Sequence, residues 1–240
     1  MTTEVHGLPD FYASAGGDVA ARLVAARLHA LWPALPGQSV LGIGHAAPYL
    51  GLWQAEARRA VSLVPAHHNG RLARWPARPA AAATLAAEED ALPFADRSFD
   101  RVLLVHGLEA AENARRLLRE VWRVLRDDGR MIVVAPNRVG MWAHLERTPF
   151  GHGQPYSRGQ LERMLARQLF RAERRDAALF LPPYGLRFLG ACAPVMERAG
   201  RLVCPRLAGV VILEAEKDLF AGMPAGAVAI RRRIVLAEAV

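Results

Sequence analysis

The stretch Ala91–Glu109, ALPFADRSFDRVLLVHGLE, decides the fold of this chain. A Pro-Phe turn and a polar corner lead into Arg101–Val105, an apolar run with the length of a strand buried on both faces. Apolar residues then recur on one side of a predicted helix, Ala111–Arg126. A turn at Asp128-Gly129 is expected to lead into a second predicted strand, Met131–Ala135. A strand, a helix and another strand in this order imply a right-handed crossover between parallel strands.

The same alternation extends along the rest of the chain. Ser157, with Gln160 three residues later, is a capping-box start for the helix Arg158–Leu169. Further predicted strands are Ser39–Ile43, Ala60–Val64, a short strand near Ala83–Leu85, Ala172–Phe180 and Gly209–Ala215, and further predicted helices are Asp18–Trp32, Tyr49–Arg59 and one near Cys192–Ala199. This pattern predicts an α/β doubly wound sheet with helices on both faces.

Size and composition favour one globular domain. The chain has 240 residues, 52% of them hydrophobic, and no uncharged apolar run of 18 residues, so we expect no membrane span. Its N-terminus lacks the pattern of a secretory signal. The two cysteines make neither a disulfide framework nor a metal quartet, and the histidines lack metal-ligand spacing. Cys192 lies in a predicted helix and Cys204 beside Pro205, and we expect both to be buried. We therefore expect a cytoplasmic protein without a metal site.

The net charge of +8 comes almost entirely from arginine, because Lys217 is the only lysine. One interpretation is a solvated, arginine-rich surface that reflects genome composition. The other is an anionic partner such as RNA, although no aromatic-interleaved basic motif accompanies the charge. The densest cluster consists of Arg158, Arg163, Arg167, Arg171, Arg174 and Arg175.

The block L-P-F-x-D-x-S-F-D, followed by an apolar strand, resembles the middle of a class I S-adenosylmethionine-dependent methyltransferase, of the kind called methyltransferase type 11. The resemblance covers about Leu31–Lys217. It implies a Rossmann-like, mostly parallel sheet with an antiparallel last strand, and S-adenosylmethionine as cofactor. It also implies one domain over residues 1–240, with an N-terminal helical cap at 1–30, a lid loop at 138–156 and a C-terminal tail at 218–240.

The resemblance also implies which residues bind the cofactor, although the glycine-rich loop is eroded. Gly44 matches the first glycine, whereas Gly42 stands where an acid is expected and Ala46 and Pro48 replace two glycines. Val64 and Pro65 stand where an acid would bind the ribose. Glu88 matches the acid that accepts from the adenine amino group. The implied cofactor-binding residues are Gly42, Gly44, His45, Ala46, Glu88, Glu89, Asp90, Leu92 and His106.

Methyl transfer requires a base only when the acceptor carries a proton, so catalytic residues are hard to identify from sequence. His106 and Glu109 follow the strand where substrate-facing residues of the family usually lie, but His106 could simply cap that strand. The loop Arg138–Tyr156 is dense in Gly, Pro and polar aromatic residues, which is typical of a substrate lid or of an ordered loop packed over the site. Its His152 and Tyr156 are further candidate bases.

The sequence therefore favours a methyltransferase that acts on an unidentified nucleophile. One alternative is a catalytically impaired methyltransferase-fold protein that acts by binding a protein partner, because two cofactor anchors are missing. A second alternative, an RNA-binding methyltransferase, depends only on the arginines.

Overall fold

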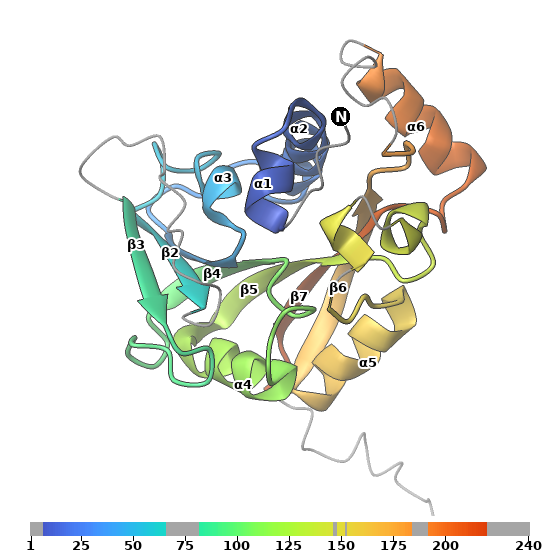
Figure 1. The fold of residues 1–240 in the computed structure, drawn as a ribbon. Coiled ribbons are helices and arrows are strands. Elements are labelled where there is room, and N and C mark those ends of the chain that lie inside the picture. The colour runs from blue at the N-terminus through green and yellow to red at the C-terminus, as the bar shows by residue number, and fades with distance from the viewer. Residues whose placement is uncertain (1–6, 66–81, 146–147, 152, 184–191, 220–240) are drawn as a thin grey trace, which may run out of the picture.

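A seven-stranded sheet in the order β3-β2-β1-β4-β5-β7-β6 forms the centre of the computed structural model (Figure 1). The structure describes residues 7–65, 82–145, 148–151, 153–183 and 192–219. Strand β7 runs antiparallel to both of its neighbours, and the other described pairs are parallel. The strands are β1 Ser39–Gly44, β2 Arg59–Pro65, β3 Ala82–Ala87, β4 Phe99–Val105, β5 Leu125–Pro136, β6 Phe170–Ala178 and β7 Val210–Lys217. The predicted fold class, with its antiparallel last strand, is confirmed.

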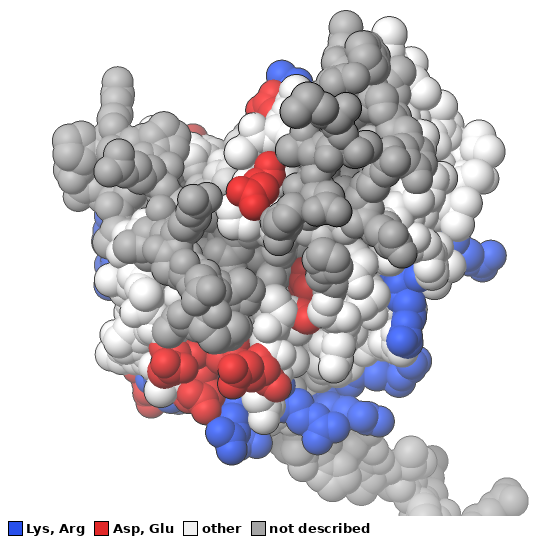
Figure 2. Space-filling view, in the orientation of Figure 1, with Lys and Arg blue, Asp and Glu red and all other residues white. Residues whose placement is uncertain are grey.

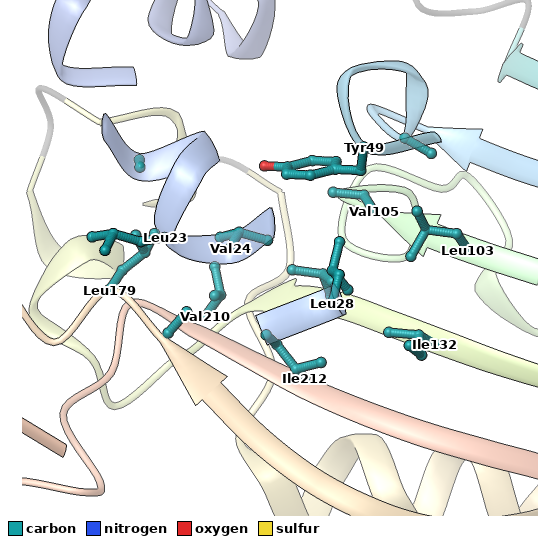
Figure 3. Packing of buried hydrophobic residues seen from close by; sticks show 14 of the residues in the cluster. Leu23, Val24, Leu28, Tyr49, Leu103, Val105, Ile132, Leu179, Val210 and Ile212 are labelled. Atoms are coloured by element: carbon teal, nitrogen blue, oxygen red, sulfur yellow. The ribbon is translucent and has the colours of Figure 1, made fainter. Parts of the chain in front are cut away.

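Helices cover both faces of the sheet (Figure 1). Helices α1, α2, α3 and α6 lie on one face, where α2 packs on β4, β5 and β7 through residues such as Leu28, Leu103 and Ile212 (Figure 3). Helices α4 and α5 close the other face over a second buried cluster. The helices are α1 Leu8–Tyr12, α2 Ala15–Leu31, α3 Ala47–Leu50, α4 Ala114–Val124, α5 Arg158–Arg167 and α6 Ala193–Val203, with 3-10 turns η1 Met141–His144 and η2 Pro149–Gly151.

Most predicted elements are present, and three local expectations were wrong. The helix expected over Tyr49–Arg59 is only the four-residue α3, because Pro48 starts it and the following chain folds into turns. Asp128-Gly129 does not precede a strand but lies inside β5, where the β4–β5 register shifts. Cys192 and Cys204 were expected to be buried and are exposed. The predicted capping box of α5 is confirmed.

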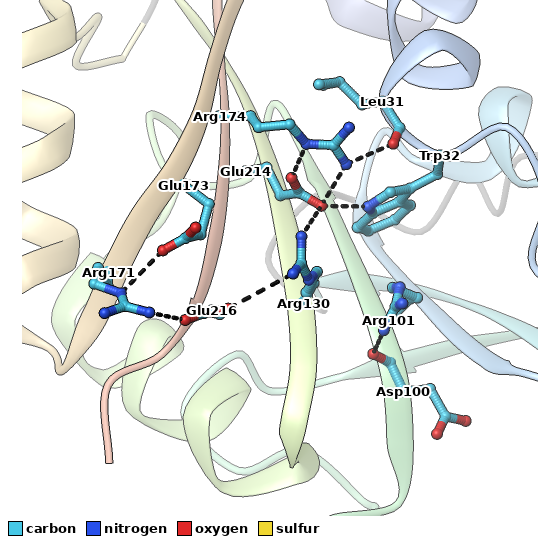
Figure 4. A network of polar contacts seen from close by, with 10 residues as sticks. All are labelled: Leu31, Trp32, Asp100, Arg101, Arg130, Arg171, Glu173, Arg174, Glu214 and Glu216. Carbon is cyan, nitrogen blue, oxygen red and sulfur yellow. Dashed lines mark hydrogen bonds and ion pairs between the residues drawn. The ribbon is translucent and has the colours of Figure 1, made fainter. Parts of the chain in front are cut away.

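A buried carboxylate ties the end of α2 to the sheet (Figure 4). Glu214 of β7 has no exposed surface and accepts hydrogen bonds from the Trp32 indole at 2.8 Å and from the Arg174 guanidinium. Arg174 also donates to the Leu31 carbonyl at the end of α2, at 2.6 Å. Burial would raise the pKa of Glu214, but these hydrogen bonds outweigh it and lower the pKa below its ordinary value. We call Trp32, Arg174 and Glu214 the anchor network.

Three of the six arginines in the cluster noted in the sequence pair with acidic residues of the protein. Arg171 pairs with Glu216 and Glu173, and Arg175 pairs with Glu162. Arg174 belongs to the anchor network. Figure 2 shows blue side chains near α5 and β6 and a separate red patch near the loop after β3. These ion pairs favour the interpretation of a solvated surface over an RNA site.

Candidate functional site

The turn after β1 and the end of β4 meet at the carboxyl edge of the sheet. The His45 N–H donates to the Val105 carbonyl at 2.7 Å. Gly44 has φ +76°, and a Cβ at this position would lie 2.4 Å from the Val105 oxygen and 3.1 Å from the Gly107 Cα. Only glycine fits such a positive φ and such a close approach without strain. Gly44 therefore brings these two strand ends together.

Three side chains form a hydrogen-bonded chain at this edge. The His106 Nδ1 lies 2.7 Å from Glu109 Oε1, and the His106 Nε2 lies 2.9 Å from the hydroxyl of Tyr12 at the end of α1. His106 and Glu109 are buried. We call Tyr12, His106 and Glu109 the site network. A carboxylate can only accept, so the Nδ1 proton lies toward Glu109 and Nε2 accepts from the Tyr12 hydroxyl.

Aromatic rings and burial control protonation around this network. The His45 ring stacks on Tyr12 with centroids 4.4 Å apart and an interplanar angle of 21°. Burial, with a contribution from nearby His106, lowers the pKa of His45 to about 3, so His45 is neutral at physiological pH. Burial and the neighbouring Tyr49 raise the pKa of Tyr12 well above its ordinary value. The Tyr12 hydroxyl therefore keeps its proton.

Among the buried polar atoms without a hydrogen-bond partner in the described structure, one belongs to the turn after β1 and one to the site network. They are Nε2 of His45 and Oε2 of Glu109. Leaving a buried polar atom unpaired is costly, so such atoms require an explanation. Both belong to residues around Tyr12 and His106. A polar ligand that donates hydrogen bonds would satisfy them.

The loop that follows β5 packs over the site network. Phe150 lies edge-on to His106, with ring centroids 5.1 Å apart. The Gln154 N–H donates to the Glu109 carbonyl at 3.0 Å, and the Tyr156 hydroxyl donates to the Leu108 carbonyl at 3.3 Å. Burial and nearby Glu109 raise the pKa of Tyr156. This segment therefore packs over His106 and Glu109, and its function as a lid stays a prediction. Of the two candidate bases in it, His152 lies outside the described residues.

The acidic residues after β3 separate into different environments. Glu88 is exposed, and it lies just beyond the carboxyl end of a strand that is parallel to β2 and β1. Gly44 and Glu88 therefore share one edge of the sheet, two strand spacings or about 10 Å apart. By contrast, Glu89 is buried and accepts from the Asn113 N–H at 2.9 Å, and Asp90 pairs with Arg116.

The other residues named as cofactor contacts lie below this surface. Leu92 is buried in the cluster under α4 and α5. Gly42 and Ala46 pack together, since a Cβ on Gly42 would lie 2.8 Å from the Ala46 Cβ. Ala46 has φ −82°, so alanine costs no backbone strain there. Their contacts support the turn that presents Gly44 and His45.

Tyr12 is the residue of the site network that sequence reasoning missed. It lies about 90 residues before His106, in a five-residue helix, and no spacing links the two positions. A short aromatic stretch, Phe11-Tyr12, ahead of a longer helix was the only signal. Phe150 was also missed, although it stands in the loop that the sequence marked as functional.

Comparisons with known proteins agree with the fold. Residues 41–133 match the family model described as methyltransferase domain. An uncharacterized Mycobacterium tuberculosis protein is 32% identical over 101 residues, which cover 39% of this chain and 35% of that protein. The chain thus spans about a third of the length of the curated relatives that it matches.

Solved structures share the fold over most of the chain. One comes from the complex between the Haloferax volcanii Trm112 methyltransferase activator and a methyltransferase, with TM-score 0.63, 18% identity, and coverage of 86% of this chain and 97% of that one. An S-adenosylmethionine-dependent methyltransferase of Mesorhizobium loti has TM-score 0.60, 19% identity, and coverage of 83% and 99%. The predicted resemblance to class I methyltransferases is confirmed in both the fold and the family model.

Proposed function

We propose that this chain transfers a methyl group from S-adenosylmethionine to an acceptor bound beside His106. The observation that carries the proposal is the site network, in which Glu109 orients His106 at the carboxyl ends of β1 and β4. Ligands of open α/β sheets bind at this edge. The matched methyltransferase domain and a neighbour of known substrate support it. That neighbour, the 1,6-didemethyltoxoflavin-N1-methyltransferase of Burkholderia thailandensis with bound S-adenosylhomocysteine, has TM-score 0.53, 16% identity, and coverage of 82% of this chain and 78% of that one.

The unpaired polar atoms fit the cofactor's amino-acid end. Glu109 Oε2 is a buried acceptor without a partner, and an ammonium group is the donor that a carboxylate binds most strongly. Exposed Glu88 follows β3, which lies three strand spacings from β4 at the same edge, where it can accept from an adenine amino group. Gly44 and His45 lie between the two carboxylates. These four residues are the proposed cofactor contacts.

The site network also suits an acceptor that carries a proton. When bound, S-adenosylmethionine supplies an activated methyl group with a neutral thioether as leaving group. In the neutral imidazole with its Nδ1 proton toward Glu109, His106 Nε2 is an acceptor, and the Tyr12 hydroxyl lies 2.9 Å from it. On displacement of Tyr12, Nε2 takes the acceptor's proton, and Glu109 stabilises the resulting imidazolium through Nδ1. Phe150 and Tyr156 help to exclude water.

Calorimetry with S-adenosylmethionine and S-adenosylhomocysteine tests the proposal. The missing ribose acid removes about 1.5–3 kcal/mol, so we expect binding that is about ten- to a hundredfold weaker than with that acid present. Micromolar binding of either compound, reduced at least about tenfold by Glu88→Gln, would support the assignment. Adenosine alone should bind more weakly, because it lacks the group that pairs with Glu109. Absence of heat at millimolar cofactor would contradict it.

The alternative of a catalytically impaired binding protein rests on the eroded loop. Ala46 and Pro48 stand in place of two glycines, and the described end of β2 offers Val64 and Pro65 rather than an acid. The same calorimetry separates the two readings, because a protein that acts only through a partner needs no cofactor.

A further inference from the structure

Helix α6 turns its polar side inward and its apolar side to solvent. Glu197 is buried and accepts from the Leu179 and Phe180 N–H groups at 2.7 and 2.8 Å. Arg201, four residues later on the same face, lies over the Phe180 ring. Val195 and Leu202, two helical turns apart, are 66% and 83% exposed. A helix that only packed on its own protein would bury its apolar side and expose its polar side.

A second segment adds apolar side chains beside the end of α6. Asn137 Nδ2 donates to the Arg206 and Ala208 carbonyls at 3.0 and 2.8 Å, which holds the chain after β5 against the chain before β7. We call the exposed apolar residues of the two segments the α6 face. It consists of Val139, Met141, Val195, Leu202, Val203 and Leu207, all between 41% and 83% exposed. Large apolar patches of this kind mark interaction sites.

Within 137–145 and 192–208, the exposed charged side chains have one sign. Arg138, Arg198 and Arg206 are exposed, and Glu197 is the only acidic residue in 137–145 and 192–208. Since Glu197 is turned inward, the exposed charged side chains of these two segments are arginines. In Figure 1, α6 stands away from the sheet at the upper right, on the same side of the sheet as α1 and α2.

We propose that the α6 face docks on an anionic lipid surface. Arginines attract the acidic headgroups, and the apolar side chains enter the boundary between headgroups and acyl chains. A symmetric contact with a second copy would place arginines against arginines, which disfavours self-association. This proposal does not depend on the methyl-transfer assignment, because the α6 face and the site network share no residue.

Vesicle flotation with the full chain tests the docking. We expect binding to phosphatidylcholine vesicles that contain phosphatidylglycerol, and little binding to phosphatidylcholine alone. The double variant Leu202→Asp/Val203→Asp should lower the partition coefficient at least about tenfold, because both side chains lie in solvent and contribute only when inserted. Arg198→Glu should weaken vesicle binding. The matched control is Arg119→Glu, which changes an exposed arginine of α4 on the opposite face of the sheet and should leave vesicle binding unchanged.

A fluorescent label separates lipid insertion from protein contact. Cys204 follows Val203 directly and is exposed, so an environment-sensitive dye on Cys204 in a Cys192→Ser background reports immersion. A blue shift with anionic vesicles, lost in the Leu202→Asp/Val203→Asp variant, supports the proposal. Equal partition of wild type and double variant would overturn it. A concentration-dependent dimer that Leu202→Asp/Val203→Asp abolishes, without any vesicle binding, would overturn it in favour of a protein interface.

Discussion

Two buried glutamates, Glu214 within β7 and Glu109 just after β4, have different surroundings. Both oxygens of Glu214 are bonded, since Trp32 and Arg174 donate to Oε1 and Arg174 donates to Oε2. Glu109 bonds His106 through Oε1 and leaves Oε2 without a partner. A complete network holds structure together, whereas an incomplete buried network is available to a ligand. We therefore assign stability to the anchor network and propose ligand binding for the site network.

The largest expected effect is on stability at the anchor network. Glu214→Gln removes the charge that faces Arg174 and should lower the free energy of unfolding by about 2–4 kcal/mol. This loss is smaller than for a fully buried ion pair, because Arg174 is partly exposed to solvent. Glu109→Gln should cost about 1 kcal/mol or less, because the amide oxygen still accepts from His106. Urea denaturation of both variants measures the difference. Equal losses would remove the distinction between the networks.

Gly44 offers the next test, because it sets the approach of β1 to β4. Gly44→Ala combines a φ of +76° with a Cβ 2.4 Å from the Val105 oxygen, and should destabilise the fold by about 2–3 kcal/mol. Its matched control is Ala46→Gly two residues later, at φ −82°, where the cost should stay at about 0.5–1 kcal/mol. If the two substitutions proved equally mild, the close packing of the strand ends would be refuted.

A smaller effect is expected at Tyr12. Tyr12→Phe removes the hydroxyl that donates to His106 Nε2 and keeps the ring that stacks on His45, so it should cost about 0.5–1.5 kcal/mol. The same change should alter the His106 ring resonances in nitrogen NMR, because Nε2 loses its donor. Unchanged His106 resonances would show that the hydrogen bond is absent in solution.

The smallest predicted effect is a pH dependence at the anchor network. The pKa of Glu214 is lowered in the folded state relative to its ordinary value of 4.5, so its stabilisation is present above about pH 4.5 and is lost as pH falls through the folded pKa. The stability difference between wild type and Glu214→Gln should therefore shrink on acidification. Denaturation curves from neutral to acidic pH measure it. A difference that stayed constant or grew would contradict the assigned pKa direction.

Sequence periodicity predicted most strands and helices because these elements carry their own local signals, whereas the antiparallel last strand was implied by the family resemblance. The apolar run Arg101–Val105 and the capping box at Ser157 are local patterns, and both predicted elements are present. The helix expected over Tyr49–Arg59 does not form, because contacts with a distant segment hold the chain in turns. The Glu56 carbonyl accepts from the Gly37 N–H, and the Arg58 N–H donates to the Gln38 carbonyl.

The candidate site could be located only in part. His106 and Glu109 stand at the end of a strand whose position the sequence predicts, so both were found. Tyr12 reaches His106 only because α1 and α2 pack over the sheet, and no local pattern encodes that distance. Sequence alone could not show that Glu89 is buried and Glu88 exposed, because adjacent residues of one type differ only in their tertiary environment.

Titration of S-adenosylmethionine into wild type, Glu109→Gln and Glu214→Gln tests most directly whether the incomplete network is the binding site. We expect Glu109→Gln to weaken binding about tenfold or more, since it loses a charge-assisted hydrogen bond, and Glu214→Gln to leave the affinity unchanged at a temperature where it remains folded. Equal affinities for all three proteins, or a loss confined to Glu214→Gln, would contradict the account.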